Sequence, residues 1–259
     1  MSSLKRFFLI FFTIFIVSSS GFLFWVSSHY VVPIMMYHNV NYTDEPKPNT
    51  VSPENFARHM AYLRENGYHV MSMDEFVQMT TEGRKFSRKS VVITFDDGYE
   101  DNYSYAFDIL QKHQLPAIIF IPSDLMDAKG YLYWGQIQEM VENGVDFGSH
   151  TRFHKYLPDL SFEEKRDEIV ESKKILEENL GVEIKHFAYP IGGFSEQIKR
   201  LVKEAGYQSA SATNRGYDRK NEDVFELNRI RFGDKDSDFV LWAKLSGYYN
   251  LFRSLKSPY

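Results

Sequence analysis

Beyond residue 30 the chain alternates between short apolar runs rich in β-branched residues and longer stretches with helical periodicity. Repeated alternation of strand and helix predicts an α/β fold with a parallel sheet, either open or closed into a barrel. An unbroken apolar run such as Val91-Val92-Ile93 is typical of a strand buried on both faces. The predicted strands are Val31–Tyr37, Val91–Phe95, Ala117–Ile121, Val145–Gly148, His186–Tyr189, Ser209–Thr213 and Asn228–Phe232.

Two of the intervening stretches carry clear helix boundaries. Ser52 followed by Pro53 predicts a helix start, because a capping hydroxyl precedes a residue that needs no N–H in the first turn. Ser161 and Glu164 have the spacing of a capping box, and Gly181 predicts the end of that helix. With no internal repeat, low-complexity tract or long linker after residue 30, we expect one domain.

The first residues have the pattern of a targeting segment. Lys5 and Arg6 precede an uncharged run over residues 7–26, which is long enough to cross a bilayer as a helix of about 20 residues. Basic residues before the run place the N-terminus inside the cell. A cleaved signal peptide is the alternative, since Ser18–Ser20 offers small residues to a peptidase. Both alternatives export the domain. The predicted segments are residues 1–6 in the cytoplasm, 7–26 as a membrane anchor and 27–259 as the exported domain.

Composition narrows the chemistry. The net charge is −5 and no basic stripe is visible, which argues against a nucleic-acid partner. The chain has no cysteine, so it has no disulfide, no thiolate metal ligand and no cysteine nucleophile. Any metal must therefore bind to histidines and carboxylates.

Such residues follow several of the predicted strands. Asp96 and Asp97 end one strand, and His150 and His154 follow another. The carboxyl ends of parallel strands lie on one face, so these side chains are expected to converge. Taken alone, Asp-Asp-Gly is ordinary turn chemistry and a histidine pair is more often solvent-exposed than metal-binding. Together, two histidines and one aspartate predict a three-ligand site for a divalent metal with open positions.

The same segments resemble a known family. Thr-Phe-Asp-Asp-Gly at 94–98 and Ser-His-Thr-Arg-Phe-His at 149–154 resemble the first two motifs of the polysaccharide deacetylase family, also called the NodB-homology domain or carbohydrate esterase family 4. Phe-Ala-Tyr-Pro-Ile-Gly at 187–192 resembles the third motif. The similarity in order and spacing extends over residues 31–232. It implies an irregular (β/α) barrel with about seven strands.

The resemblance also implies a role for each matching residue. Asp97, His150 and His154 would hold the metal, with zinc expected first and cobalt, nickel, manganese or iron as alternatives. Asp96 would act as general base toward the attacking water. The backbone N–H of Tyr189 would stabilise the oxyanion, and Tyr189 would also contact the substrate.

One departure from the family pattern concerns the general acid. Many members carry a histidine in a C-terminal Leu-x-His motif, whereas this chain has no histidine after His186. The poly-N-acetylglucosamine deacetylase subgroup carries the acid in an N-terminal Tyr-His segment, which residues 36–40 resemble. His38 is therefore the expected acid, and a structural histidine at a strand end is the alternative. His186 competes for the role, but it opens a strand and should lie at the opposite end of the sheet.

The second departure is Ala188, where many members have an arginine that pairs with the base. Arg229 and Arg231 are two apart on a predicted strand and share a face. The hypothesis is that Arg229 supplies the missing charge and keeps Asp96 ionised; an arginine at the edge of the core is the alternative. Trp134 could stack on a sugar ring or simply pack.

The expected activity is hydrolysis of N-acetyl groups on an extracytoplasmic polysaccharide, first of all a β-linked N-acetylglucosamine polymer. A peptidoglycan or chitin-like substrate is the nearest alternative. A different class of function is a non-catalytic carbohydrate-binding module within a polymer-export assembly.

Overall fold

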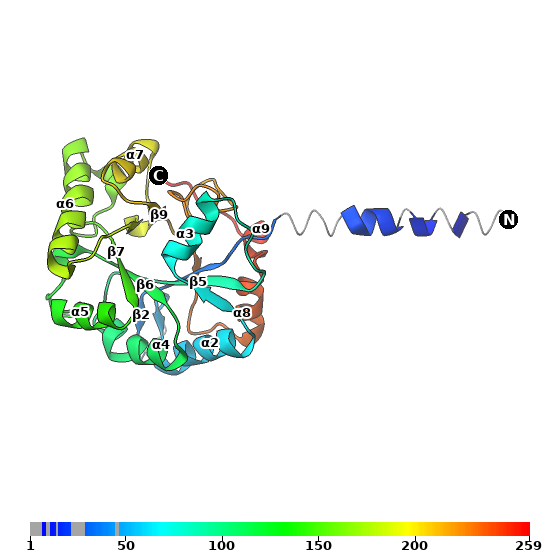
Figure 1. Cartoon of the computed structure of the whole chain (residues 1–259), viewed down its shortest axis with the longest axis horizontal. Helices are drawn as coiled ribbons and strands as arrows, with labels where there is room; N and C mark the ends of the chain where they lie inside the picture. The colour runs from blue at the N-terminus through cyan, green and yellow to red at the C-terminus, as the bar shows by residue number, and fades with distance from the viewer. Residues whose placement is uncertain (1–6, 9–10, 14, 22–28, 45–46) are drawn as a thin grey trace.

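The computed structural model describes residues 7–8, 11–13, 15–21, 29–44 and 47–259. Strands and helices alternate along the chain from residue 34 onward (Figure 1). The strands are β1 (Ile34–Tyr37), β2 (Asn39–Val40), β3 (Thr50–Val51), β4 (His69–Met71), β5 (Ser90–Asp96), β6 (Ala117–Ile121), β7 (Val145–Ser149), β8 (His186–Ala188), β9 (Ser209–Ser211) and β10 (Ile230–Arg231). The α-helices are α2 (Pro53–Glu65), α3 (Met73–Thr81), α4 (Asp108–His113), α5 (Trp134–Glu142), α6 (Phe162–Leu180), α7 (Glu196–Glu204), α8 (Asp238–Leu245) and α9 (Tyr249–Phe252). A π-helical segment, η1 (Asn102–Phe107), and three 3₁₀ turns, η2 (Ser123–Leu125), η3 (Leu157–Asp159) and η4 (Pro190–Gly192), complete the set.

The main sheet is parallel and runs in the order β10-β1-β5-β6-β7-β8-β9, with β4 paired to β5 outside this order. The segment before β10 returns to β9, because Ser211 and Leu227 form a parallel bridge and Arg229 N–H donates to Thr213 O at 3.0 Å. The two edges of the sheet thus approach each other, and the sheet curls into a barrel-like form. All seven predicted strands are present, and the expected parallel sheet is confirmed as a curled half-barrel, which is consistent with the predicted (β/α) barrel.

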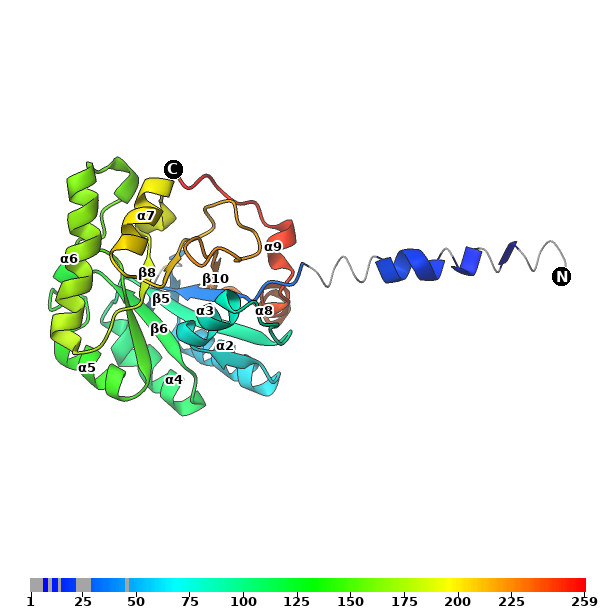
Figure 2. The same ribbon diagram turned by 45° about the horizontal axis from the view of Figure 1, so that its top comes forward.

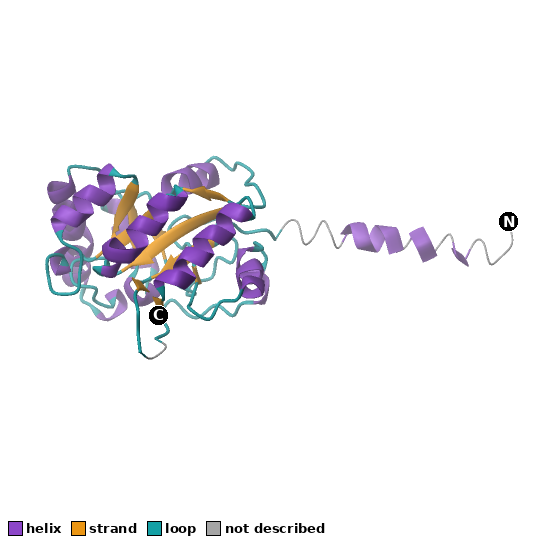
Figure 3. Cartoon of the chain, turned by 90° about the horizontal axis from the view of Figure 1, so that it is seen from below, coloured by secondary structure: helices purple, strands orange, loops and turns teal. Residues whose placement is uncertain are grey.

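Helices surround this curled sheet. In Figure 1, α2, α4 and α5 follow one another around its outside, and Figure 2 shows α6 beside α7. Figure 3 shows the strands enclosed between helices when the molecule is turned over. Both predicted helix starts are confirmed. Ser52 Oγ accepts from the Asn55 amide at the start of α2, and Ser161 caps α6, which ends at Gly181 with φ of 67°.

Strand β5 shows how the sequence pattern places the site. Its side chains alternate between two apolar clusters, because successive residues of a strand point to opposite faces. Val91, Ile93 and Phe95 pack in the larger cluster with the outer helices, and Val92 packs in the smaller one with α3. Asp96 lies on the same face of β5 as Val92 and is itself buried. The last residue of β5 therefore carries a carboxylate toward the inside of the curled sheet.

The N-terminal segment is described only in part. Residues 7–8, 11–13 and 15–21 are helical and their large apolar side chains are exposed. Within the described residues, no helix combines the length and the apolar character that a bilayer crossing requires. The predicted anchor over residues 7–26 also includes positions 9–10, 14 and 22–26, and the predicted cytoplasmic residues 1–6 likewise lie outside the described part. The anchor stays a prediction.

Candidate metal and catalytic site

The first element of the site is a buried ion pair at the end of β5. Arg229 donates from Nη1 to Asp96 Oδ1 at 2.6 Å and from Nη2 to Asp96 Oδ2 at 2.7 Å. The Arg229 side chain is fully buried and that of Asp96 is 3% exposed. Burial alone would raise the pKa of Asp96, but the adjacent Arg229 guanidinium and His150 hold that pKa well below its ordinary value. The bidentate contact is the one that the Arg229 hypothesis requires.

The second element is a cluster of three side chains directly beyond the strand ends. Potential ligand atoms of Asp97, His150 and His154 all lie within 4.8 Å of one another. Asp97 Oδ1 is 3.5 Å from His150 Nε2 and 3.3 Å from His154 Nε2. A tetrahedral zinc ion with bonds of about 2.0–2.2 Å separates its ligands by similar distances. Burial lowers the pKa of His150 to about 4, so its ring is neutral near pH 7, the form that binds a metal.

The histidine loop after β7 is fixed by hydrogen bonds from several directions. His150 Nδ1 lies 2.8 Å from Ala188 O, which leaves Nε2 to face Asp97. Glu168 on α6 accepts from the amides of Arg152 and Phe153, both at 2.9 Å. The loop is therefore preorganised, as a metal site requires of the residues around its ligands.

Backbone strain is concentrated at the same place. Seven non-glycine residues in the described part of the chain have positive φ, and four of them are Asp97, Thr151, His154 and Ile191. This left-handed conformation is unfavourable for residues with a Cβ and persists only where surrounding contacts impose it. Two of the three candidate ligands, Asp97 and His154, thus have a left-handed backbone conformation that the surrounding contacts maintain.

His38 lies at the end of β1, beside Asp96. Burial lowers the pKa of His38 to about 4, while the Asp96 carboxylate acts in the opposite direction. Its Nδ1 is buried and has no hydrogen-bond partner among the described residues. Two consecutive residues that the sequence did not point to, Asp101 and Asn102, hold the backbone around His38. Asn102 Nδ2 donates to His38 O at 2.7 Å, and Asp101 accepts from the Val40 amide at 3.1 Å. Both residues follow the Asp-Asp-Gly turn, the only signal that could have drawn attention to them.

The predictions for Tyr189 are wrong. Its backbone N–H donates to Ser211 O at 2.9 Å as part of the β8–β9 pairing, so this amide is not available to an oxyanion. Its side chain is fully buried and the hydroxyl donates to Phe225 O at 3.0 Å, which also excludes contact with a polymer. The reason is the strand register, which a sequence pattern does not specify.

The structure also points to different aromatic residues near the site. Trp134 begins α5, is half-buried and packs against the core, which favours its alternative as a packing residue. Tyr99 and Tyr131, by contrast, stack with ring centroids 5.6 Å apart. Burial, and after it the neighbouring Asp97 carboxylate, raise the pKa of both phenols, which places this pair beside the cluster of ligand atoms.

His186 lies at the amino end of β8, the end opposite to the site, as its position in the strand predicted. Its Nε2 contacts Asp74 Oδ1 at 2.9 Å and its Nδ1 contacts Ser209 Oγ at 2.9 Å. Since Ser209 is buried, this chain of contacts ties α3 to β8 and β9 and exposes no nucleophile.

Similar proteins are found among protein families, curated proteins and solved structures. Residues 83–210 match the family model described as polysaccharide deacetylase. The Bacillus subtilis protein YxkH, named for a polysaccharide deacetylase, is 32% identical over 200 residues, which cover 77% of this chain and 71% of that protein. The poly-β-1,6-N-acetyl-D-glucosamine N-deacetylase of Staphylococcus epidermidis is 28% identical over 63% of this chain and 61% of its own length.

Among solved structures, the Streptococcus pyogenes deacetylase PplD in complex with acetate is similar, with a TM-score of 0.77 and 26% identity. The match covers 83% of this chain and 97% of that one. The shared fold extends over nearly all of the described domain.

Proposed function

Because the chain belongs to the polysaccharide deacetylase family, we propose that it is a metal-dependent hydrolase that removes N-acetyl groups from an extracytoplasmic polysaccharide. One observation carries the proposal: three potential ligand atoms lie within 4.8 Å of one another, beside a buried carboxylate held ionised by an arginine. A non-catalytic binding module would have no need of that charge arrangement.

The residues present fit a divalent metal. The donor set consists of two imidazoles and one carboxylate, and it leaves room for water and substrate. The contact between His150 Nδ1 and the Ala188 carbonyl orients one of the two imidazoles. A metal bound by Asp97, His150 and His154 would supply Lewis-acid polarisation of the acetyl carbonyl and of water. Zinc is the first candidate for this nitrogen and oxygen set, with cobalt, nickel, manganese and iron as alternatives.

We assign the general base to Asp96. Ionised at neutral pH, it can accept the proton of the attacking water, and the two contacts from Arg229 fix the plane of its carboxyl group. Arg229 keeps the Asp96 carboxylate negatively charged inside the curled sheet, whereas burial would favour the protonated form of a carboxylate without such a partner.

His38 is the proposed acid for the leaving amine. With its pKa lowered to about 4, the ring is neutral before reaction, so it must gain a proton during the cycle before it can donate one. Asp96, which interacts electrostatically with His38, is the proposed source once it has taken the proton of water. The acid role therefore depends on a proton passing from the base to His38.

A replacement for the Tyr189 amide comes from the same turn. Pro190 has no N–H, and the amides of Gly192 and Gly193 donate to Tyr189 O and Pro190 O. Ile191 is exposed and has φ of 59°, and its amide has no acceptor among the hydrogen bonds of the described residues. We propose the Ile191 N–H as the oxyanion donor.

The proposed substrate is a β-linked N-acetylglucosamine polymer, because relatives named as poly-β-1,6-N-acetyl-D-glucosamine N-deacetylases match this chain. Peptidoglycan and chitin-like oligomers are the alternatives. We further propose that residues 7–26 hold the domain at the outer face of the cytoplasmic membrane. Protease accessibility of the domain in intact spheroplasts would test that location, and a domain protected until lysis would contradict it.

The activity is tested with the full chain, by measuring bound metal and the acetate released from N-acetylglucosamine oligomers. The parent should contain about one divalent ion per chain, and chelation should abolish acetate release until metal is restored. Asp97→Ala should lose both metal and activity, whereas Asp108→Ala, which removes a carboxylate from α4, should keep both. Equal acetate release by the parent and Asp97→Ala would contradict the proposal.

A further inference from the structure

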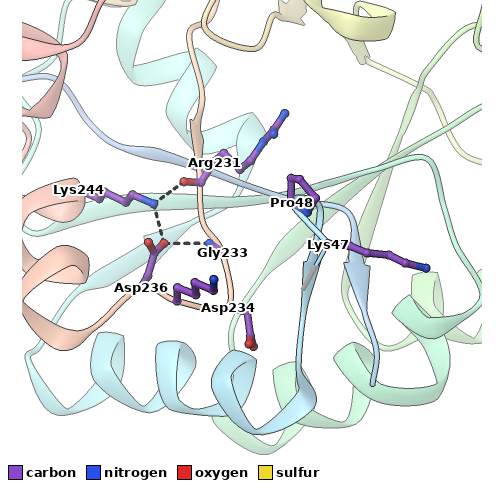
Figure 4. Close-up of a pocket in the computed structure, with 8 residues that line it drawn as sticks. Lys47, Pro48, Arg231, Gly233, Asp234, Asp236 and Lys244 are labelled. Carbon is purple, nitrogen blue, oxygen red and sulfur yellow. Dashed lines mark hydrogen bonds and ion pairs between the residues drawn. The ribbon is translucent and has the colours of Figure 1, made fainter. Parts of the chain in front are cut away.

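A groove of about 460 Å³ lies at the carboxyl end of β10. Arg231 ends β10 and Gly233 follows it, while Lys47 and Pro48 belong to the loop between β2 and β3 (Figure 4). Arg231 is paired with Met36 of β1, two residues before His38, so the groove lies next to the end of β1 that carries the proposed acid. Burial is the main cause of the lowered pKa of His38, and the positive charge of Arg231 contributes to it.

The acidic residues of this groove already have partners. Asp236 accepts from Lys244 Nζ at 2.6 Å and from the Gly233 amide at 2.9 Å (Figure 4). Asp234 accepts from Ser52 Oγ and Asn55 Nδ2, both at 2.7 Å, at the start of α2. Both carboxylates are therefore committed to holding the walls together.

Three cations of the same walls, Lys47, Arg231 and Lys235, are not neutralised. All three are exposed, and among the described residues none of their charged groups has an ion pair or a side-chain hydrogen bond. They form a local excess of positive charge on a protein whose net charge is −5. Such a patch next to a reaction centre attracts anions and raises their local concentration.

The arrangement suits an extended ligand. Lys47 and Arg231 point in different directions on either side of Pro48, an arrangement suited to contacts with separate groups of one ligand (Figure 4). A second hollow of about 900 Å³ adjoins the groove, shares Lys47 and Asp234 with it, and has Asp44 on its wall. A polymer that passes the catalytic residues could contact the cations at separate points.

We propose that the cationic groove of Lys47, Arg231 and Lys235 binds acidic groups carried by the glycan, so that the enzyme prefers an N-acetylated polysaccharide bearing carboxylates or phosphates over a neutral one. The inference rests on the proposed deacetylase activity, and within it favours an acid-bearing glycan, such as the peptidoglycan alternative, over the neutral N-acetylglucosamine polymer. A neutral N-acetylglucosamine polymer gains nothing from these charges, whereas lactyl or peptide carboxylates, or phosphodiesters, pair with them.

The test compares three forms of one N-acetylglucosamine oligomer: neutral, carboxymethylated and phosphorylated. For the parent, kcat/KM should be higher on at least one acidic form, chiefly through a lower KM. This preference should shrink when the ionic strength rises above about 0.1 M, where the Debye length falls below about 10 Å. The form that is preferred identifies carboxylate or phosphate as the natural group. Lys47→Gln/Lys235→Gln should reduce the preference about tenfold, the size expected for two exposed charge contacts.

Lys85→Gln, which removes an exposed charge between α3 and β5, is the matched control and should keep the preference. Equal kcat/KM on all three forms, or the same loss in the control, would overturn the inference. Binding of the three oligomers to Asp97→Ala separates this outcome from failure of the proposed function. Tighter binding of an acidic form without acetate release by the parent supports the groove and refutes the deacetylase, whereas turnover without any charge preference does the reverse.

Discussion

Removal of the Arg229 side chain tests how the site keeps its base ionised. Arg229→Ala deletes two charge-assisted hydrogen bonds to Asp96, of 2.6 and 2.7 Å, between side chains that are 0% and 3% exposed. Breaking a buried ion pair by removing one partner costs about 3–5 kcal/mol, because the other charge is left without compensation. For a domain of this size, about 2–4 °C per kcal/mol predicts a fall in Tm of about 6–20 °C.

The same variant should change the pH dependence of both stability and activity. In the parent, the pKa of Asp96 is lower in the folded state than in the unfolded state, so the ionised carboxylate stabilises the fold above about pH 4. That stabilisation is lost as the pH falls toward the depressed folded value. Without Arg229 burial raises the pKa of Asp96, so the acidic limb of kcat/KM against pH should move to higher pH.

Two comparisons separate the charge pair from other contacts of Arg229, which also donates to Thr94 Oγ1 and Ala212 O. Arg229→Lys keeps a charge but not the bidentate geometry and should be intermediate. In an Asp96→Asn background, Arg229→Ala should destabilise less, because no buried charge is left behind. Urea unfolding followed by circular dichroism, together with the pH–rate profile, gives both quantities. A loss under about 1 kcal/mol with an unchanged acidic limb would refute the argument.

Three further changes test the acid role of His38, the correction at Tyr189 and the close packing of β7. His38→Gln should lower kcat by about 10²–10⁴-fold with little change in Tm, and an unchanged kcat would remove His38 from the acid role. Tyr189→Phe deletes a buried hydrogen bond, so it should cost about 1 kcal/mol in unfolding free energy while kcat/KM is retained; a large loss of activity would restore Tyr189 to the site. Gly148→Ala would place a Cβ 2.8 Å from His186 O and should destabilise by about 1–3 kcal/mol, measured by thermal unfolding; an unchanged Tm would show that β7 can shift.

Local sequence signals were sufficient for most of the framework. The seven strands follow from short β-branched runs, and the capped starts of α2 and α6 follow from Ser52 and Ser161, because these features depend on residues adjacent in the chain. The short strand β4 was missed because its three residues carry too little pattern to detect. The resemblance to a family, rather than periodicity, named the candidate ligands.

The corrections share a different cause. Tyr189 was expected to offer its amide, but the pairing of β8 with β9 commits that N–H to Ser211. Strand pairing is a long-range property, and a shift of one residue exchanges the two faces of a strand. The cations Lys47 and Lys235 also carried no motif, since their significance lies in facing one groove without partners.

The sequence by itself determined that this is an α/β chain with carboxylates and histidines at strand ends, because alternation, caps and motifs are written in neighbouring residues. Only the tertiary structure decided which of those groups meet. Arg229 and Asp96 are 133 residues apart, and their contact depends on the curl that brings the segment before β10 to the inner face of β5. Burial then gives that contact its strength, because a charge removed from water must find its partner within the fold.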